Sequence, residues 1–405
     1  MKINLLKSSI NGLKLFKDSH LEVDFITLKK VSQQDVDEHL VENLFGSVYK
    51  QNLLAFAGIN ASGKTTTLKL ITMILELFIQ NRTLETLSND EMFDHLEDES
   101  TLINIFYAEN KLYELTSIIK RDENGKFHFL SETLKTKPAR SNISKEKLLN
   151  FKDIQPYRTR DDVEKMAMGY LRGDTSIFMQ ILKELSILDG RRYIFDMIQF
   201  TNFNVFGTLN TIPSGYIQYL DPDIEEIEFI NRDNSTNFAK LLIKIKFFNQ
   251  DVIEIPASDL WKYLSSGTIK GLNLLLAIEK VLKTGGYIVI DEIENHLNKT
   301  VAITMINLFK SEVNKNNATL IFSTHYSEIL DDIERSDSIY FNIKNKGKIE
   351  LENLSSHVNR ADKKKSNIYL SGLLGTAPKY TGYQALKKSL KNKMTQTSNA
   401  DSREA

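Results

Sequence analysis

The sequence has no cysteine among its 405 residues. Disulfide bonds and thiolate metal sites are therefore excluded, and the composition fits a reducing cytoplasm. The formal net charge is only -1, so no overall excess of charge indicates binding to nucleic acid or to a membrane surface. The first residues lack the apolar core of a signal peptide. No apolar run approaches the roughly 18 residues needed to cross a bilayer, and we expect a cytoplasmic protein without a membrane partner.

The sequence also lacks internal repeats and sustained heptads, which excludes a long coiled coil. Its strongest apolar runs instead alternate with segments of helical periodicity. The apolar runs are 53–57, 287–290 and 319–323, and the helical segments are 66–80, 267–284 and 299–313. Continuously apolar strands that alternate with helices predict a parallel sheet covered on both faces. Residues 1–27 alternate apolar and polar side chains, which predicts antiparallel strands with a hairpin turn at Asn11-Gly12.

The most specific motif is a glycine-bounded loop between the first of these apolar strands and the helix that follows it. Gly58 and Gly63 fit the pattern G-x-x-x-x-G-K-[ST], in which loop N–H groups and a helix N-terminus bind phosphate oxygens. Lys64 is predicted to reach the β- and γ-phosphates, and the Thr65 hydroxyl to hold Mg²⁺. The predicted nucleotide-binding residues of this loop are Gly58, Asn60, Ala61, Ser62, Gly63, Lys64, Thr65 and Thr66.

A pair of carboxylates follows the most apolar strand, 287–290. In P-loop proteins this pattern is the Walker B motif. Asp291, at the end of the strand, is placed to hold Mg²⁺, which prefers hard oxygen ligands. Glu292 is placed to polarise the attacking water as a general base. The sequence therefore predicts a site for ATP and Mg²⁺ in which Thr65 and Asp291 are the metal ligands.

Two further stretches lie at the ends of predicted elements. Ser265, Ser266 and Gly267 precede a helix, where hydroxyls and a helix N-terminus form a second anion-binding surface. Alone this stretch is only a good N-cap, but its place before the Walker B strand favours a phosphate reader that acts on another subunit. His325 ends the next strand; isolated histidines are more often structural, but the order of the motifs favours a contact with the γ-phosphate. The predicted catalytic residues are Glu292, His325 and Lys64.

The four motifs together resemble the ATP-binding-cassette set of Walker A, an L-S-x-G-x signature, a D-E Walker B and a switch histidine. The run Asp291-Glu292-Ile293-Glu294-Asn295-His296-Leu297 differs from the D-E-P-T of transporters and resembles the soluble RecF/SMC/OLD-like branch, as does Asn60. Within that branch the chain is most similar to the short ATPases of bacterial anti-phage and abortive-infection systems such as AbiL, PARIS and Septu. The signature departs from L-S-G-G-Q through Ser266 and Thr268, a variant found in defence ATPases of this kind.

This resemblance implies an α/β fold with a P-loop mixed sheet, an N-terminal antiparallel β subdomain and a helical insertion or lid. The implied segments are the two halves of the ATPase domain, 1–80 and 215–345, and the insertion 81–214 between them. Residues 346–405 are expected to be a basic tail, because Lys and Arg outnumber Asp and Glu there. A homodimer or higher homo-oligomer is also implied, in which the signature acts in trans and Asn298 lies in the D-loop that contacts the partner. The Q-loop glutamine stays open between Gln180, Gln199 and Gln218.

Four segments are predicted from local pattern alone. Residues 33–50 are expected to form a short helix that leads into the strand 53–57, and the polar, basic segment 132–160 is expected to be a flexible loop. Residues 160–198 have helical spacing, whereas Tyr216 to Leu220 is predicted to be a strand.

The resemblance leads us to expect an ATP-binding and ATP-hydrolysing component of an anti-phage defence system. No Glu followed by Asp-x-Asp occurs after the last predicted strand, so we expect the effector, a nuclease or toxin, to be a separate protein. Two alternatives stay open. One is a RecF-like DNA-repair ATPase that binds duplex DNA through the basic tail and the segment 132–160. The other is a scaffold that binds ATP with little turnover.

Overall fold

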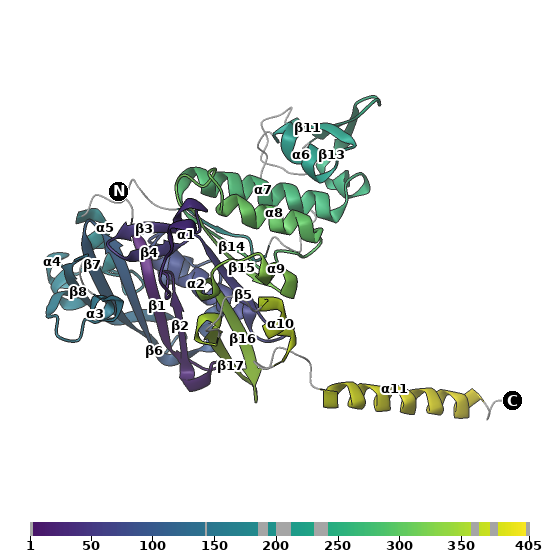
Figure 1. Ribbon diagram of the computed structural model, residues 1–405. Coiled ribbons are helices and arrows are strands. Elements are labelled where there is room, and N and C mark those ends of the chain that lie inside the picture. The colour runs from purple at the N-terminus through teal and green to yellow at the C-terminus, as the bar shows by residue number, and fades with distance from the viewer. Residues whose placement is uncertain are drawn as a thin grey trace.

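The computed structural model describes residues 3–141, 144–184, 193–199, 212–230, 242–357, 364–372 and 380–401. Within these residues the fold is mixed α/β, with one antiparallel sheet and one mixed sheet of six strands each. A long helix, α2 (Lys64–Phe78), lies between the two sheets, and further helices cover the other face of the mixed sheet (Figure 1). The predicted α/β fold with an N-terminal antiparallel part is therefore confirmed.

The antiparallel sheet has the strand order β2-β1-β6-β7-β8-β9. Its strands are β1 (Asn4–Leu13), β2 (His20–Asp24), β6 (Leu96–Ala108), β7 (Lys111–Arg121), β8 (Phe127–Pro138) and β9 (Pro156–Thr159). Alternate residues of a strand point to the same face, and Tyr113, Leu115 and Ile119 of β7 belong to the core that also contains α2. The sheet unites strands from the segments 1–80 and 81–214.

The hairpin turn predicted at Asn11-Gly12 is wrong. β1 continues through both residues, and the chain reverses after Phe16, at a short 3-10 turn of residues 17–19. The pairing register with β6 shifts between Asn11 and Leu13, and Gly12 has φ +92°. A Cβ on Gly12 would lie 2.5 Å from the Ser100 hydroxyl. The Asn-Gly pair therefore forms a β-bulge, which requires the same left-handed glycine as a tight turn.

The mixed sheet has the order β10-β14-β15-β5-β16-β17. Its strands are β5 (Leu53–Ala57), β10 (Ile194–Asp196), β14 (Tyr287–Ile290), β15 (Thr319–Thr324), β16 (Ile339–Asn345) and β17 (Lys348–Asn353). The first five in spatial order are parallel, and β17 is antiparallel to β16. This confirms the predicted parallel sheet and brings the carboxyl ends of β5, β14 and β15 to one edge.

Both faces of the mixed sheet are buried, as its continuously apolar strands predict. In β5, Leu54 and Phe56 face the core that contains α2, whereas Leu53, Ala55 and Ala57 face a second core. The second core is formed with the helices α7 (Ser266–Thr284), α8 (Lys299–Phe309), α9 (Ser327–Asp331) and α10 (Lys365–Leu370). Every residue of β5 is therefore buried, and the loop that follows it starts from a rigid position.

A smaller unit packs on α7, at the top of Figure 1. It consists of α6 (Ser214–Leu220) and a three-stranded antiparallel sheet of β11 (Ile224–Ile230), β12 (Leu242–Phe247) and β13 (Ile253–Pro256). The strand predicted at 216–220 is wrong, because these residues form α6. The apolar residues Tyr216, Ile217 and Leu220 have the spacing of one helical face and pack together in the core beneath this sheet.

Three other local predictions need correction. Only α1 (Gln33–Asp37) is helical in 33–50, where it is followed by the hairpin β3 (Val41–Phe45) and β4 (Val48–Gln51). The segment 132–160 is not a loop; it contains the end of β8, α3 (Lys145–Leu149) and β9. The loop prediction rested on the basic residues of this segment. Lys135 and Lys137 instead alternate along β8 with buried or half-buried neighbours such as Leu134, as in a strand with one exposed face. The remaining α-helices in the described residues are α4 (Arg160–Met166), α5 (Phe178–Glu184) and α11 (Tyr380–Asp401). The helical prediction for 160–198 is therefore only partly correct, because β10 lies in this range, and residues 185–192 lie outside the described residues.

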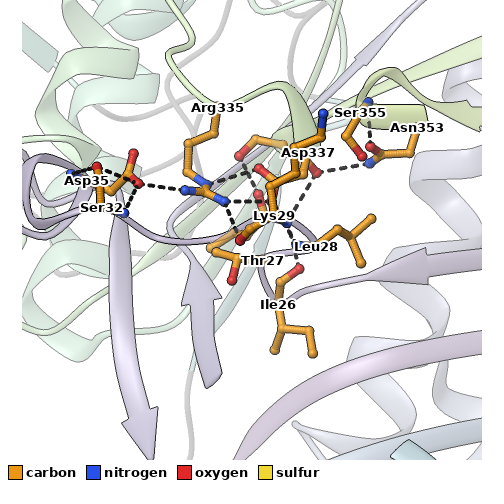
Figure 2. A network of polar contacts seen from close by, with 12 residues as sticks. Ile26, Thr27, Leu28, Lys29, Ser32, Asp35, Arg335, Asp337, Asn353 and Ser355 are labelled. Carbon is orange, nitrogen blue, oxygen red and sulfur yellow. Dashed lines mark hydrogen bonds and ion pairs between the residues drawn. The ribbon is translucent and has the colours of Figure 1, made fainter. Parts of the chain in front are cut away.

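A buried polar network ties the link between β2 and α1 to the mixed sheet (Figure 2). The Asp337 carboxylate accepts hydrogen bonds from the backbone N–H groups of Leu28 and Lys29 at 2.7 and 2.8 Å. Arg335 pairs with Asp337 at 2.7 Å and with Asp35, in the first turn of α1, at 2.8 Å. These charged side chains are satisfied by one another and by the backbone, so this network fixes the antiparallel sheet to the region just before β16.

Candidate active site

The glycine-bounded loop lies at the carboxyl end of β5 and opens α2. Gly63 is the N-cap of this helix and has φ +96°. A Cβ on Gly63 would lie 2.4 Å from the Ile349 side chain, and one on Gly58 would lie 2.6 Å from the Asn342 carbonyl oxygen. Both glycines are therefore required by close packing, and the loop curls as a phosphate-binding loop does.

The other residues of the loop differ in exposure. Asn60 and Ala61 are exposed, and Ala61 has φ +60°. The Ser62 side chain is buried, and its hydroxyl has no hydrogen-bond partner among the described residues. Thr66 is half-buried in the first turn of α2. A buried hydroxyl without a partner and a helix N-terminus in one loop fit the oxygens of a phosphate group.

Lys64 is buried within the loop. Its ammonium donates to the carbonyl oxygens of Gly58 and Ile59 at 2.9 and 3.2 Å, and lies 3.1 Å from Nδ1 of His325. Burial lowers the pKa of Lys64, while nearby carboxylates, Asp291 first among them, act to raise it. Phosphate oxygens placed here would favour the charged form of Lys64.

A second cluster joins α2 to the ends of β14 and β15. The Thr65 hydroxyl donates to Oδ2 of Asp291 at 2.6 Å, and the Ser323 hydroxyl donates to Oδ1 at 2.5 Å. In the described part of the chain no group of three or more His, Asp and Glu residues could hold a metal ion. The Thr65 and Asp291 oxygens nevertheless fit Mg²⁺, because this ion takes few protein ligands and completes its shell with phosphates and water.

Glu292 and His325 form a direct pair. Nε2 of His325 lies 2.7 Å from Oε1 of Glu292. A lysine ammonium can only donate, so Nδ1 of His325 accepts from Lys64 and Nε2 carries the proton that is donated to Glu292. Glu292 has φ +47°, and its N–H donates to the Ser323 hydroxyl at 2.8 Å. The structure therefore brings Lys64, His325 and Glu292 into one line of contacts.

The signature residues lie at the N-terminus of α7, near the loop that follows β14. Ser265 caps this helix, and its hydroxyl accepts from the Thr268 N–H at 3.0 Å. A Cβ on Gly267 would lie 2.5 Å from the His296 carbonyl oxygen. Asn298 caps α8 by accepting from the Thr300 N–H at 2.9 Å.

The Ser266 hydroxyl lies 3.5 Å from Nδ1 of His296. Among the described residues, no hydrogen bond joins the Ser265 or Ser266 side chain to Lys64 or Thr65. The signature is therefore not part of the contacts that Lys64 makes within the same chain.

Comparison with protein families identifies the domain that carries this site. The family model described as "AAA domain, putative AbiEii toxin, Type IV TA system" matches residues 53–331, which include the loop of Lys64, the signature and the Asp291–His325 cluster. The chain belongs to this AAA family. It is therefore a P-loop protein of an ATPase family, and no curated protein sequence matches it.

Two solved structures are similar to this AAA family member at 15% sequence identity. One is an SMC head bound to the C-winged helix domain of ScpA, with a TM-score of 0.47 over 87% of this chain and 98% of that chain. The other is the SMC head domain from Thermotoga maritima, with a TM-score of 0.41 over 86% of this chain and 98% of that chain. No helix in the described residues of the AAA protein is long and apolar enough to span a membrane.

Three polar residues of the AAA site were not assigned a role from the sequence. Ser323 bridges Asp291 and the Glu292 backbone. Glu294 accepts the His325 N–H at 2.5 Å. Lys270, in α7, donates to the backbone of the loop after β14. Glu294 could have been identified from the sequence, because it follows Glu292 by two residues. Lys270 could not, because a lysine within a helical pattern is not distinctive.

Proposed function

We propose that this protein binds ATP with Mg²⁺ and hydrolyses it in a head-to-tail assembly of identical subunits. The contact line of Lys64, His325 and Glu292 is the observation that carries the proposal. It places a cation for phosphate oxygens beside a carboxylate that is oriented by a histidine N–H. Phosphoryl transfer depends on such positioning and charge neutralisation more than on covalent chemistry.

Each residue of the site has a separate role in phosphoryl transfer. Bound Mg²⁺ would be held by Thr65 and Asp291 and would neutralise charge on the phosphates. Lys64 would exchange its contacts with loop carbonyls for the β- and γ-phosphates. Glu292 would accept a proton from the attacking water, and the His325 N–H would keep the Glu292 carboxylate in place.

The signature supports an assembly rather than a single subunit. Ser265 and Gly267 present a helix N-terminus, and the Ser265 and Ser266 side chains make no hydrogen bond to the P-loop of their own chain within the described residues. In the proposal they complete the phosphate site of a second subunit, with Asn298 at the interface. ATP would favour this closed assembly by its higher affinity for it.

We assign the Q-loop to Gln199. β10 ends at Asp196 and is parallel to β14, so Gln199 follows at the same edge of the sheet as Asp291. Gln218 instead lies in α6 and contacts the Glu225 carbonyl oxygen. Gln180 lies in α5, outside the mixed sheet.

A role in bacterial anti-phage defence is the wider proposal. The description of the matching family names an AbiEii toxin of a type IV toxin–antitoxin system, and the motifs resemble those of abortive-infection ATPases. In this role the ATP-dependent assembly senses infection and regulates a separate nuclease or toxin. The effector, and not this chain, would then carry out the defence activity.

The Glu292→Gln variant tests both the proposed ATP hydrolysis and the proposed regulation of an effector. It should bind ATP normally, hydrolyse it about 10²-fold more slowly and accumulate as ATP-bound assemblies, measured by phosphate release and light scattering. Copurification from the native host with this variant as bait should retain the effector, and Lys64→Ala should not. The exposed Glu312→Gln is the control. Wild-type turnover in Glu292→Gln would show that another group is the base, and recovery of no partner would contradict the regulatory role.

A further inference from the structure

Lys270 is a buried cation that the ATP site does not use directly. It lies in the first turns of α7, after the signature residues, and is 3% exposed. Its ammonium donates to the carbonyl oxygens of Glu292, at 3.2 Å, and Asn295, at 2.5 Å. Burial lowers the pKa of Lys270 to about 8, against the opposing effect of Glu294 and other carboxylates. A buried lysine with such contacts holds the backbone of the loop after β14 to the signature helix.

The loop that Lys270 holds has a conformation that needs support. Glu292 and His296 have φ +47° and +62°, in the left-handed region that residues other than glycine rarely adopt. Such residues keep this conformation only where their surroundings fix it. Lys270 bonds one end of this stretch directly, and Gly267 packs against the His296 carbonyl oxygen at the other end.

Glu294 extends the same connection to the switch histidine. Its Oε1 accepts the backbone N–H of His325 at 2.5 Å. Its Oε2 is buried and has no hydrogen-bond partner among the described residues. The Glu294 carboxylate therefore fixes the backbone of His325, whose side chain orients Glu292, and its charge also acts on Lys270.

We propose that Lys270 is a positioning residue that couples the signature of one ATP site to the Glu292 base of the other. The inference rests on the proposed head-to-tail assembly. In that assembly the signature of a subunit faces the partner's nucleotide, while Glu292 of the same subunit serves its own nucleotide. A movement of the α7 N-terminus on nucleotide binding would shift the Glu292 and Asn295 carbonyls through Lys270. Each site would then hydrolyse ATP only when the other is occupied.

The test is the dependence of ATP hydrolysis on ATP concentration. Wild-type protein should give a Hill coefficient above about 1. Lys270→Met, which keeps an unbranched side chain only one atom shorter but removes its charge and donors, should give a Hill coefficient of about 1 and a kcat about tenfold lower. Lys270→Arg keeps the charge and donors and should restore both values. Lys283→Met removes an exposed pair with Glu279 on the same helix and should change neither value.

Several results would overturn the coupling. A wild-type Hill coefficient of about 1, or an unchanged coefficient in Lys270→Met, would show that Lys270 does not link the sites. A lower kcat with unchanged cooperativity would show that Lys270 only supports the fold. If Lys270→Met does not fold, Lys270→Gln, which keeps a neutral donor, should show the same loss of cooperativity. Absence of hydrolysis or assembly in the wild type would instead contradict the proposed function itself.

Discussion

Two buried glutamates show how differently the two sheets use charge. Glu132, in β8 of the antiparallel sheet, accepts hydrogen bonds from Ser117, Ser176, Ile177 and Arg160 at 2.6 to 3.0 Å. Glu294, beside the mixed sheet, uses one oxygen for the His325 N–H and leaves the other buried without a partner among the described residues.

This difference separates a stabilising role from a functional one. A buried carboxylate whose oxygens are all satisfied holds segments of the chain together, and breaking it destabilises the fold. At the edge of the mixed sheet, the buried Ser62 hydroxyl and one Asn342 oxygen also lack partners among the described residues. Polar groups that are left incomplete beside a P-loop are those that a ligand can complete. Changes at this edge should therefore alter activity, and changes at Glu132 should alter stability.

The largest effect is expected from Lys64→Ala, at the mixed-sheet edge. Removing a buried cation from the phosphate loop should lower ATP hydrolysis by at least about 10³-fold. The free energy of unfolding should change little, because burial already disfavours the charged ammonium. Phosphate release and thermal unfolding measure the two quantities.

Lys69→Ala is the matched control for this variant. Lys69 lies on the same helix but forms a surface pair with Glu91, which contributes about 0–1 kcal/mol. Its hydrolysis rate should therefore equal that of the wild type. Normal hydrolysis by Lys64→Ala would show that the loop is not a nucleotide site. If Lys64→Ala instead unfolds, the mixed-sheet edge would also serve stability, and the two sheets would not differ in the way described above.

The fold and part of the site could be predicted because their signals are local. The P-loop pattern needs a strand, two glycines and a helix in sequence, and β5, Gly58, Gly63 and α2 supply them in order. Strands such as β14 are buried on both faces and are therefore apolar throughout. This pattern can be recognised in the sequence without knowing which segments pack against the strand.

The rest of the site depends on contacts between distant segments. Lys270 meets the Glu292 carbonyl only after α7 packs beside β14, and nothing around position 270 marks it. The failed strand prediction at 216–220 has a related cause. The short apolar pattern of Tyr216, Ile217 and Leu220 suits a strand or a helix, and packing on α7 decides for the helix.

A smaller effect is expected from Arg160→Met, in the antiparallel sheet. Arg160 donates to Glu132 at 2.9 Å and to the Thr175 and Arg172 carbonyl oxygens. Its loss leaves a buried carboxylate without its cation, which should lower the free energy of unfolding by about 3–5 kcal/mol. The hydrolysis rate per folded molecule should remain that of the wild type. Denaturant unfolding, with phosphate release from the folded fraction, measures both.

The neighbouring Arg158→Met serves as the control for the antiparallel sheet. Arg158 pairs with Glu184, whose side chain is 43% exposed, so its removal should lower the free energy of unfolding by only about 0–1 kcal/mol. Equal losses in Arg158→Met and Arg160→Met would mean that the Glu132 network is not a special source of stability. A selective loss of hydrolysis in Arg160→Met would mean that this network also serves the site.

The smallest effect is expected from Asp24→Asn, and it concerns stability. Asp24 lies where the two sheets meet. Its N–H donates to the Tyr340 hydroxyl of β16 at 3.0 Å, and burial raises the pKa of Asp24 to about 6. The folded state therefore holds a proton that the unfolded chain releases near pH 4. The contribution of Asp24 to the free energy of unfolding is present in full below about pH 4 and is lost as the pH rises to about 6.

Asp24→Asn should therefore stabilise the protein by about 1–3 kcal/mol at about pH 7.5, with a gain that disappears near pH 4. Denaturant unfolding across this pH range measures the difference, and the exposed Asp18→Asn should show none. Lys7 and Lys145 lower the pKa of Asp24 in part, so the gain should be smaller than burial alone would give. A gain that does not vary with pH would mean that the Asp24 charge is not its source. Unchanged ATP hydrolysis in the variant would show that the junction between the sheets supports the fold without taking part in the chemistry.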